Sequence, residues 1–241
     1  LLAVVLVLAA CGGAAQPATT SGPVEEPTAT PVEEPSVASA PEADTEAGDS
    51  ETSGLNTYVI VPEESTASYL VDEEFFQGAL AKLGIQAGLA DVVGSTQEIE
   101  GQLQLNLDNL ASPLGANRFQ VNLASLTTDQ SRRDNWIREN GPEFNKHPLA
   151  EFTATGIEGA PGSYTQGDQV QFKLTGDLTI REVTQPVTFD VTASLEGDTI
   201  TGVATAPLLL TDFGIDPPNF ANTLAVEDEF EVKVEFTARE Q

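Results

Sequence analysis

Apolar and polar residues alternate with a period of two along most of the chain from residue 57 to the C-terminus. The clearest case is residues 229–236, where one parity carries only Phe and Val and the other carries only Glu and Lys. Successive side chains of a β-strand point to opposite faces, so this period predicts strands with one buried and one solvated face. The expected strands cover residues 57–61, 65–71, 102–107, 119–123, 151–157, 170–180, 187–195, 199–210 and 229–236. Short Gly, Pro and Asp turns separate them, which predicts an antiparallel all-β barrel or sandwich of eight or nine strands.

Two segments depart from this period and predict helices. Residues 129–140 follow Thr128 as an N-cap and precede a Gly-Pro pair as a stop signal, which indicates one short helix. Residues 75–89 are apolar with helical spacing, and three glycines interrupt them. We expect this second stretch to form a mobile helical lid over one mouth of the barrel.

The N-terminal run, residues 1–10, is uncharged and apolar and ends at Cys11. It is shorter than the roughly 20 residues that a membrane-spanning helix needs, and it suits the apolar region of a signal peptide. The tetrapeptide Leu-Ala-Ala-Cys that ends at Cys11 resembles the lipobox of bacterial lipoproteins, in which the cysteine is diacylated and becomes the mature N-terminus. Two acyl chains suffice for stable membrane anchoring. The chain contains no methionine, so we expect the translational start and a basic segment to precede Leu1.

Residues 12–56 are rich in Pro, Ala, Thr, Ser and Glu and contain no Lys, Arg or aromatic residue. Such a segment has too little apolar surface to fold, so we expect a disordered tether before a folded domain of residues 57–241. Nine of the 38 acidic residues lie in the tether, which leaves 29 acids and 10 bases, a net charge of −19, in the folded domain. This charge argues against nucleic acid as a partner and against adsorption to anionic lipid headgroups.

The chain contains a single histidine, His147, and a single cysteine, Cys11. One histidine and one cysteine are too few for a His-based metal cluster or an intramolecular disulfide, and we expect no Ser-His-Asp triad. Acidic groups such as residues 227–229, or Asp212 with Asp216, carry oxygen ligands that suit calcium, but they lack EF-hand spacing and equally suit a solvated face. We therefore expect a binding protein rather than an enzyme, without a metal or a cofactor.

Aromatic residues fall on the apolar parity of the expected strands or in segments that can close a barrel end. Each one can be ordinary core, but as a set they predict an apolar tunnel. The candidate contacts to an apolar ligand are Phe119, Trp136, Phe152, Phe172, Phe189, Phe213, Phe230 and Phe236. Arg132 and Arg133 on the expected short helix are candidates for an anionic headgroup, with pairing to nearby carboxylates such as Asp129 and Asp134 as the alternative.

Several short motifs occur in an order that is typical of a known family. They are Tyr-Val-Ile-Val-Pro from Tyr58, the run from Ser125 that leads to Arg133-Asp134, Leu-Thr-Ile-Arg from Leu178 and Asp-Phe-Gly-Ile from Asp212. Over nearly all of the folded domain, the chain resembles the YceI-like family of extracytoplasmic, lipocalin-like polyisoprenoid-binding proteins. This resemblance implies an eight-stranded antiparallel barrel that holds a long isoprenoid or another amphiphile along its axis. The chain departs from many members at Glu64, where they carry a histidine before the serine, and in the length of residues 75–89.

The pattern and the resemblance together predict an exported lipoprotein, anchored through Cys11 to the extracytoplasmic face of a membrane. We expect its barrel to bind, store or carry an isoprenoid lipid of the quinone or polyprenyl type, or a similar long-chain amphiphile. The alternative is a filled barrel that serves as a surface adhesion or scaffold domain with no lipid ligand. The expected partners are a lipid and the membrane, without nucleic acid, and a homodimer is compatible with the sequence.

Overall fold

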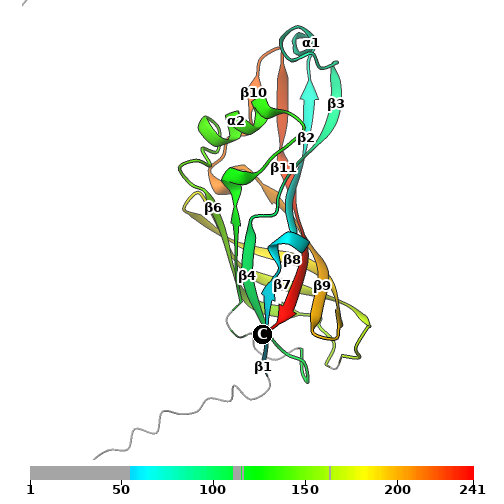
Figure 1. Ribbon diagram of the computed structural model, residues 1–241. Coiled ribbons are helices and arrows are strands. Elements are labelled where there is room, and N and C mark those ends of the chain that lie inside the picture. The colour runs from blue at the N-terminus through cyan, green and yellow to red at the C-terminus, as the bar shows by residue number, and fades with distance from the viewer. Residues whose placement is uncertain (1–54, 111–114, 116, 163) are drawn as a thin grey trace, which may run out of the picture. The chain divides into compact units, whose positions relative to one another are not determined.

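The strands of the folded domain form one antiparallel sheet that closes on itself (Figure 1). The computed structural model describes residues 55–110, 115, 117–162 and 164–241, so Cys11, the signal segment and nearly all of the tether lie outside the described residues. The first strand begins at Leu55, two residues before the expected domain boundary. The strands are β1 (Leu55–Ile60), β2 (Thr66–Phe75), β3 (Gly88–Thr96), β4 (Ile99–Asn106), β5 (Arg118–Asn122), β6 (Leu149–Glu158), β7 (Gln169–Ile180), β8 (Val183–Glu196), β9 (Thr199–Leu209), β10 (Asn219–Phe220) and β11 (Leu224–Glu240).

Eight positions around the barrel are filled by these strands. The ring runs β1-β4-β5-β6-β7-β8-β9-β11 and closes because β1 also pairs with β11. β2 follows β1 along the same edge of β11. β3 pairs with β2 and lies in line with β4. β10 contributes two further residues that pair with β11. The described strands therefore confirm the antiparallel, eight-stranded, lipocalin-like barrel.

The two ends of the barrel are built differently. At the end where β1 lies, which we call the base, the ring is complete because β1 pairs with both β4 and β11. At the opposite end, which we call the mouth, β2 and β3 form a hairpin and β3 stands last in the strand order. Within the described part of the chain, the second edge of β3 makes only a single bridge, between Ser95 and Thr127.

A short 3-10 turn, η1 (Pro62–Glu64), separates β1 from β2 and interrupts the ladder along β11. Ser65, which is 1% exposed, fills this interruption. Its hydroxyl donates to the carbonyl of Val61 at 2.8 Å and accepts from the amide of Thr237 at 3.0 Å. A buried backbone group without a partner destabilises the fold, so this hydroxyl preserves the closure of the ring.

The expected short helix is present as α2 (Ser131–Glu139), and it lies at the mouth (Figure 1). It begins two residues later than predicted, and the prediction of Thr128 as its N-cap is wrong. The Thr128 hydroxyl instead accepts from the Gln130 amide at 3.1 Å and donates to the Asp134 carboxylate at 2.7 Å, which fixes the turn before the helix. Arg138, near the other end, donates to two backbone carbonyls of the preceding loop at 2.7 Å each.

The expected helix over residues 75–89 is wrong in its extent. Only α1 (Gly78–Leu83) is helical, while Phe75 ends β2 and pairs with Gly88 at the start of β3. The helix stops at Gly84, whose φ of 77° lies in the left-handed region that favours glycine. The segment is therefore a β-hairpin with a short helix at its tip, at the top of Figure 1. Among the described helices, none is long and apolar enough to cross a membrane.

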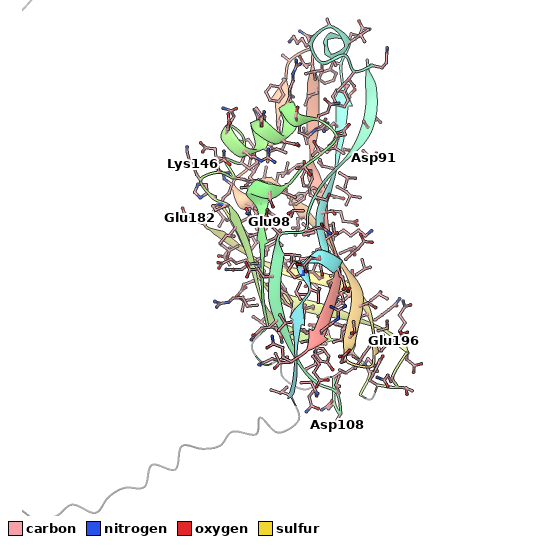
Figure 2. All side chains as sticks on the ribbon, in the orientation of Figure 1. Asp91, Glu98, Asp108, Lys146, Glu182 and Glu196 are labelled. Carbon is pink, nitrogen blue, oxygen red and sulfur yellow. The ribbon has the colours of Figure 1, made fainter. Side chains whose placement is uncertain are left out.

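The interior holds one connected apolar core, to which all eight positions of the ring contribute. Charged side chains cover the outside, as the period of two predicts. Examples that are exposed and labelled in Figure 2 are Asp91, Glu98, Asp108, Lys146, Glu182 and Glu196.

Candidate functional site

A cavity of about 580 Å³ occupies the barrel interior and extends to the mouth. Its wall is almost entirely carbon and comes from inward side chains of β1, β2, β4 to β9 and β11, with α1 and α2 at the mouth. This volume lies in the range of small-molecule pockets, about 300–1,000 Å³. The adhesion or scaffold alternative requires an interior filled by side chains. The cavity shows that the interior is not filled.

Seven of the eight aromatic residues predicted to contact an apolar ligand line this cavity. They are Phe119, Trp136, Phe152, Phe172, Phe189, Phe230 and Phe236. Phe213 does not line it, because it lies in the turn η3 (Thr211–Phe213) and its ring, 1% exposed, packs in the core. The prediction missed Tyr69, Phe75 and Phe144, which also line the cavity. The inward parity of β2 is the signal that identifies the first two.

Four of the wall aromatics lie against a glycine of a neighbouring strand. A Cβ atom on Gly94 would stand 2.2 Å from Tyr69 Cε1, and one on Gly202 would stand 2.7 Å from Phe236 Cζ. Because each ring takes the space that the absent side chain leaves over the neighbouring strand, it lies along the wall and leaves the lumen open. The pairs are Tyr69 with Gly94, Phe119 with Gly101, Phe152 with Gly176 and Phe236 with Gly202.

The cavity has a floor on the side of the base. A second space of only about 50 Å³ lies beyond it, and Leu103, Phe172 and Phe236 line both spaces and so separate them. Above the floor, the Phe152 ring contacts Phe189 edge-on, with centroids 5.0 Å apart. A space of that size holds a few water molecules at most, so it is too small for a lipid-sized ligand.

A buried ion pair joins α2 to β2 at the mouth. The Arg133 guanidinium donates from Nε and Nη2 to both carboxylate oxygens of Glu73 at 2.9 Å each, and from Nη1 to Asp129 at 2.6 Å. Burial lowers the pKa of Arg133, but the hydrogen bonds and charge of Glu73, then of Asp129, outweigh burial and hold that pKa above its ordinary value. Arg133, one of the two predicted headgroup residues, thus has two carboxylate partners.

Arg132, the other predicted headgroup residue, lies beside Lys82 on the cavity wall. Its Nη1 donates to the backbone carbonyl of Lys82 at 3.0 Å, and the Lys82 ammonium donates to Thr223 Oγ1 at 2.9 Å. Neither cation has a carboxylate within 4.0 Å in the described part of the chain. These two side chains are therefore the cations best placed for a polar headgroup. Lys82 had no signal in the sequence, because only the fold brings it to Arg132.

Tyr69 brings a polar atom to the wall near the ion pair. Its hydroxyl is buried and has no hydrogen-bond partner among the residues that the structure describes. Burial raises the pKa of Tyr69 well above its ordinary value, and the positive charge of Arg133 only partly opposes this. The hydroxyl is therefore a neutral, buried group at physiological pH, and its ring packs over Gly94 of β3.

Other polar residues named from the sequence lie away from the cavity wall. His147 follows α2, and its backbone amide donates to the carbonyl of Glu143 at 3.2 Å. Asp228, considered for calcium, accepts from the amide and hydroxyl of Thr211 at 2.9 and 2.8 Å. No group of three or more His, Cys, Asp or Glu within the described residues could hold a metal ion. The mouth is thus where polar groups meet the cavity.

The barrel is similar to several solved structures. A polyisoprenoid binding domain from Saccharophagus degradans, implicated in plant cell wall breakdown, superposes with a TM-score of 0.57 at 11% identity, covering 76% of this chain and 98% of its own. BcnA of Burkholderia cenocepacia superposes with a TM-score of 0.54 at 17% identity, covering 74% of this chain and 98% of its own. These similarities show the fold. The alignments cover nearly the whole of each neighbour, so those solved chains consist of this barrel.

Sequence comparison identifies the family. A UPF0312 protein of Pseudomonas putida is 30% identical over 161 residues, which are 63% of this chain and 78% of the relative. Protein YceI of Shigella flexneri is 29% identical over 134 residues, 55% of this chain and 64% of the relative. The model of the YceI-like domain matches residues 58–238, from β1 to β11. The chain therefore belongs to the YceI-like family.

Proposed function

We propose that this protein binds, stores or carries an isoprenoid lipid of the quinone or polyprenyl type, or a similar long-chain amphiphile, inside its barrel. The observation that carries the proposal is the carbon-walled cavity of about 580 Å³ that reaches polar groups at the mouth. The similarity of the fold to a domain named for polyisoprenoid binding supports it.

The cavity favours a ligand with an apolar chain and one polar end. Apolar burial contributes about 25 cal/mol per Å² and has no direction, so an aromatic wall holds a chain without selecting its chemical detail. At the mouth, Lys82 and Arg132 offer positive charges. We infer that the chain points to the floor and that the polar end lies beside these two side chains.

The proposal is for a binding protein and not for an enzyme. Glu73 and Arg133, ionisable groups on the cavity wall, are engaged with each other in a bidentate ion pair. A carboxylate held in this way is poorly placed to transfer a proton to a ligand. We propose no cofactor other than the bound lipid itself.

We also propose that the domain is exported and tethered to the extracytoplasmic face of a membrane through a diacylated Cys11. The apolar run before this residue and the tetrapeptide that it ends support the proposal. Palmitate labelling of the chain, expressed behind a complete signal sequence, should give a labelled protein in the membrane fraction. Cys11→Ala should lose both properties, and a natural chain that carries no label would contradict the anchor.

The direct test of lipid binding uses residues 55–241, which contain the complete ring and resemble solved chains that are barrel alone. Organic extraction and mass spectrometry of the purified domain should release an isoprenoid lipid, or the empty domain should bind an added isoprenoid quinone. Trp136 is the only tryptophan and lies on the wall, so quenching of its fluorescence reports quinone binding. A lipid-free domain that binds no added isoprenoid would overturn the proposal.

Neighbouring residues of β9 provide a matched pair of variants. Ala204 lines the cavity, and Thr205 lies on the opposite parity of the strand. Ala204→Phe places a ring in the lumen and should lower quinone affinity at least about tenfold, roughly 1.4 kcal/mol. Thr205→Phe should leave the affinity unchanged. An equal effect of both substitutions would show that the quinone binds outside the lumen.

A further inference from the structure

We propose that the mouth carries a docking surface for a lipid bilayer, formed by the tip of the β2–β3 hairpin and the segment around β10. We define this surface, the mouth collar, as residues 75–90 and 217–226. The proposal goes beyond ligand binding, because the docking can be measured on a domain that holds no ligand.

The mouth collar is depleted of charge in a strongly charged domain. Its 26 residues contain one charged side chain, Lys82, whereas charged residues make up 20% of the whole chain. None of the 29 acidic residues of the folded domain lies in the collar. Glu74 and Asp91 flank the hairpin segment in the sequence, and Figure 2 labels Asp91 on β3.

The collar also exposes large apolar side chains. Leu89 is 81% exposed, Leu80 is 51% exposed and Phe220 is 42% exposed. They come from β3, α1 and β10 in turn, and Val93, 50% exposed, continues the series along β3. Single exposed apolar residues are ordinary, but several at one end of a domain mark an interaction site.

Direct contacts join the two segments of the collar. The Phe76 amide donates to the carbonyl of Thr223 at 2.8 Å, and Lys82 donates to the hydroxyl of the same residue at 2.9 Å. A Cβ atom on Gly78 would stand 2.1 Å from the carbonyl oxygen of Asn222, so the start of α1 rests directly on the turn after β10. Figure 1 shows α1 and β10 at the same end of the barrel. The two segments therefore form one surface.

The inner side of the collar is cavity wall. Leu83, Ile85, Phe220 and Leu224 all line the cavity. An amphiphile that leaves the cavity thus passes from an apolar wall to the exposed leucines of the hairpin tip. If that tip sits in a bilayer, the chain reaches the acyl region without crossing water, which would cost about 0.8 kcal/mol for each exposed methylene.

Charge favours a bilayer as the occupant. The collar's single charge is positive, and the guanidinium of Arg132 lies beside it, hydrogen-bonded to the Lys82 carbonyl at 3.0 Å. Cations next to exposed apolar side chains suit a membrane interface, where the cations meet phosphates and the apolar groups enter the headgroup region. Anionic lipid repels the acidic remainder of the domain over a Debye length of about 8–10 Å, which turns the mouth toward the surface.

Co-sedimentation with vesicles tests the proposal, on residues 55–241 so that neither the apolar N-terminal run nor Cys11 contributes. The domain should bind vesicles of phosphatidylcholine containing a minority of phosphatidylglycerol. Leu80→Asp combined with Leu89→Asp should lower the partition coefficient at least about tenfold, because a carboxylate resists entry into the apolar region. The matched control, Leu149→Asp with Leu209→Asp, changes leucines that are 45% and 39% exposed outside the collar and should leave binding unchanged.

Lys82→Gln tests the electrostatic part separately. A basic residue near an anionic surface strengthens binding about fivefold, so this variant should lose that factor on vesicles with phosphatidylglycerol and much less on phosphatidylcholine alone. An equal loss on both kinds of vesicle would overturn the attraction of Lys82 to an anionic membrane surface.

The remaining outcomes also decide the proposal. A natural domain that binds neither kind of vesicle would overturn it, as would a loss in the control variant equal to that in the collar variant. A dimer in size-exclusion chromatography that only the collar substitutions dissociate would assign the surface to a second copy of the chain and overturn the bilayer. Leu80 and Leu89 do not line the cavity, so the collar variant should still bind quinone in detergent, which keeps this test separate from that of the lipid ligand.

Discussion

The mouth and the base of the barrel share strands but end differently. β11 runs through both, pairing with β1 near the base and with β2 toward the mouth. At the base the ring is complete, and packing leaves a space of only about 50 Å³ beyond the cavity floor. At the mouth β3 has no second strand partner among the described strands, and a cavity of about 580 Å³ extends there. A single sheet thus provides a packed end and an open end.

At the mouth, side chains of α2 contact β2, α1 and β10. Arg133 pairs with Glu73 on β2, and Arg132 donates to a backbone carbonyl of α1. Trp136 packs edge-on against Phe220 of β10, with ring centroids 5.6 Å apart. A few side-chain contacts are easier to exchange than a ladder of backbone hydrogen bonds, so we expect a ligand to enter where the ladder stops.

The largest expected difference between the two ends is the loss of unfolding free energy when an ion pair is removed. Arg133→Ala leaves the carboxylate of Glu73, 4% exposed, without its partner and should lower the free energy of unfolding by about 3–5 kcal/mol in urea titrations. Arg239→Ala removes the pair with Glu64 near the base, where both side chains are half exposed, and should change stability little. Equal losses of stability in the two variants would contradict the claim that the buried Arg133–Glu73 pair holds α2 on β2.

Substitution of the glycines that lie against the wall aromatics should have different effects in the lumen and at the floor of the cavity. Gly94→Ala displaces the Tyr69 ring toward the lumen and should weaken quinone binding about tenfold, measured by quenching of Trp136 fluorescence. Gly202→Ala displaces Phe236 at the floor and should cost about 1–3 kcal/mol of stability with a smaller change in affinity. If Gly94→Ala binds quinone normally, the rings do not control the width of the lumen.

The hairpin tip should affect exchange more than stability. Replacing residues 78–87 by a two-residue Asn-Gly turn removes α1 and leaves the ring of eight strands complete. We expect quinone release, followed by stopped-flow fluorescence, to accelerate several-fold with a small change in melting temperature. A large loss of melting temperature with unchanged release would instead make the tip part of the core.

The strands of the closed ring were easier to predict from the sequence than β3, the second strand of the hairpin at the mouth. Strands such as β8 and β11 keep apolar residues on one parity and polar residues on the other, so the period of two identified them. β3 was missed because Gly94 and Thr96 face inward while Leu89 and Val93 face outward, which breaks the period. Leu89, one of the outward residues that break the period of β3, also belongs to the proposed mouth collar. Local sequence rules often fail where a position serves a function, so this failure agrees with the proposal.

The polar groups of the mouth were predictable only in part. The sequence placed Arg132 and Arg133 together on a helix, and both do lie on the cavity wall. It offered Asp129 and Asp134 as their nearest carboxylates, and Arg133 does contact Asp129. The buried partner, Glu73, lies 60 residues away in the chain, so no local spacing could identify it.

The smallest expected effect concerns a tyrosine near the base. Tyr58 is fully buried with a hydroxyl that has no partner among the described residues, so Tyr58→Phe should raise stability by about 1 kcal/mol. Burial, together with Glu240 and Asp198, raises the pKa of Tyr58 to about 12 from its ordinary 10.0. The unfolded chain therefore loses this proton first, and stability should fall as the pH rises from 10 toward 12. In urea titrations, the free energy of unfolding of Tyr58→Phe should fall less steeply with pH between 10 and 12. An unchanged dependence on pH would contradict the raised pKa of Tyr58.

The most direct test of the central claim is native mass spectrometry of residues 55–241. One cavity of about 580 Å³ that extends to the mouth predicts one lipid for each domain after incubation with an isoprenoid quinone, visible as one added mass. Ala204→Phe should remove that added mass and Thr205→Phe should retain it. A domain that keeps its bare mass with every isoprenoid tried, or that retains the lipid equally in both variants, would contradict a ligand held inside the barrel.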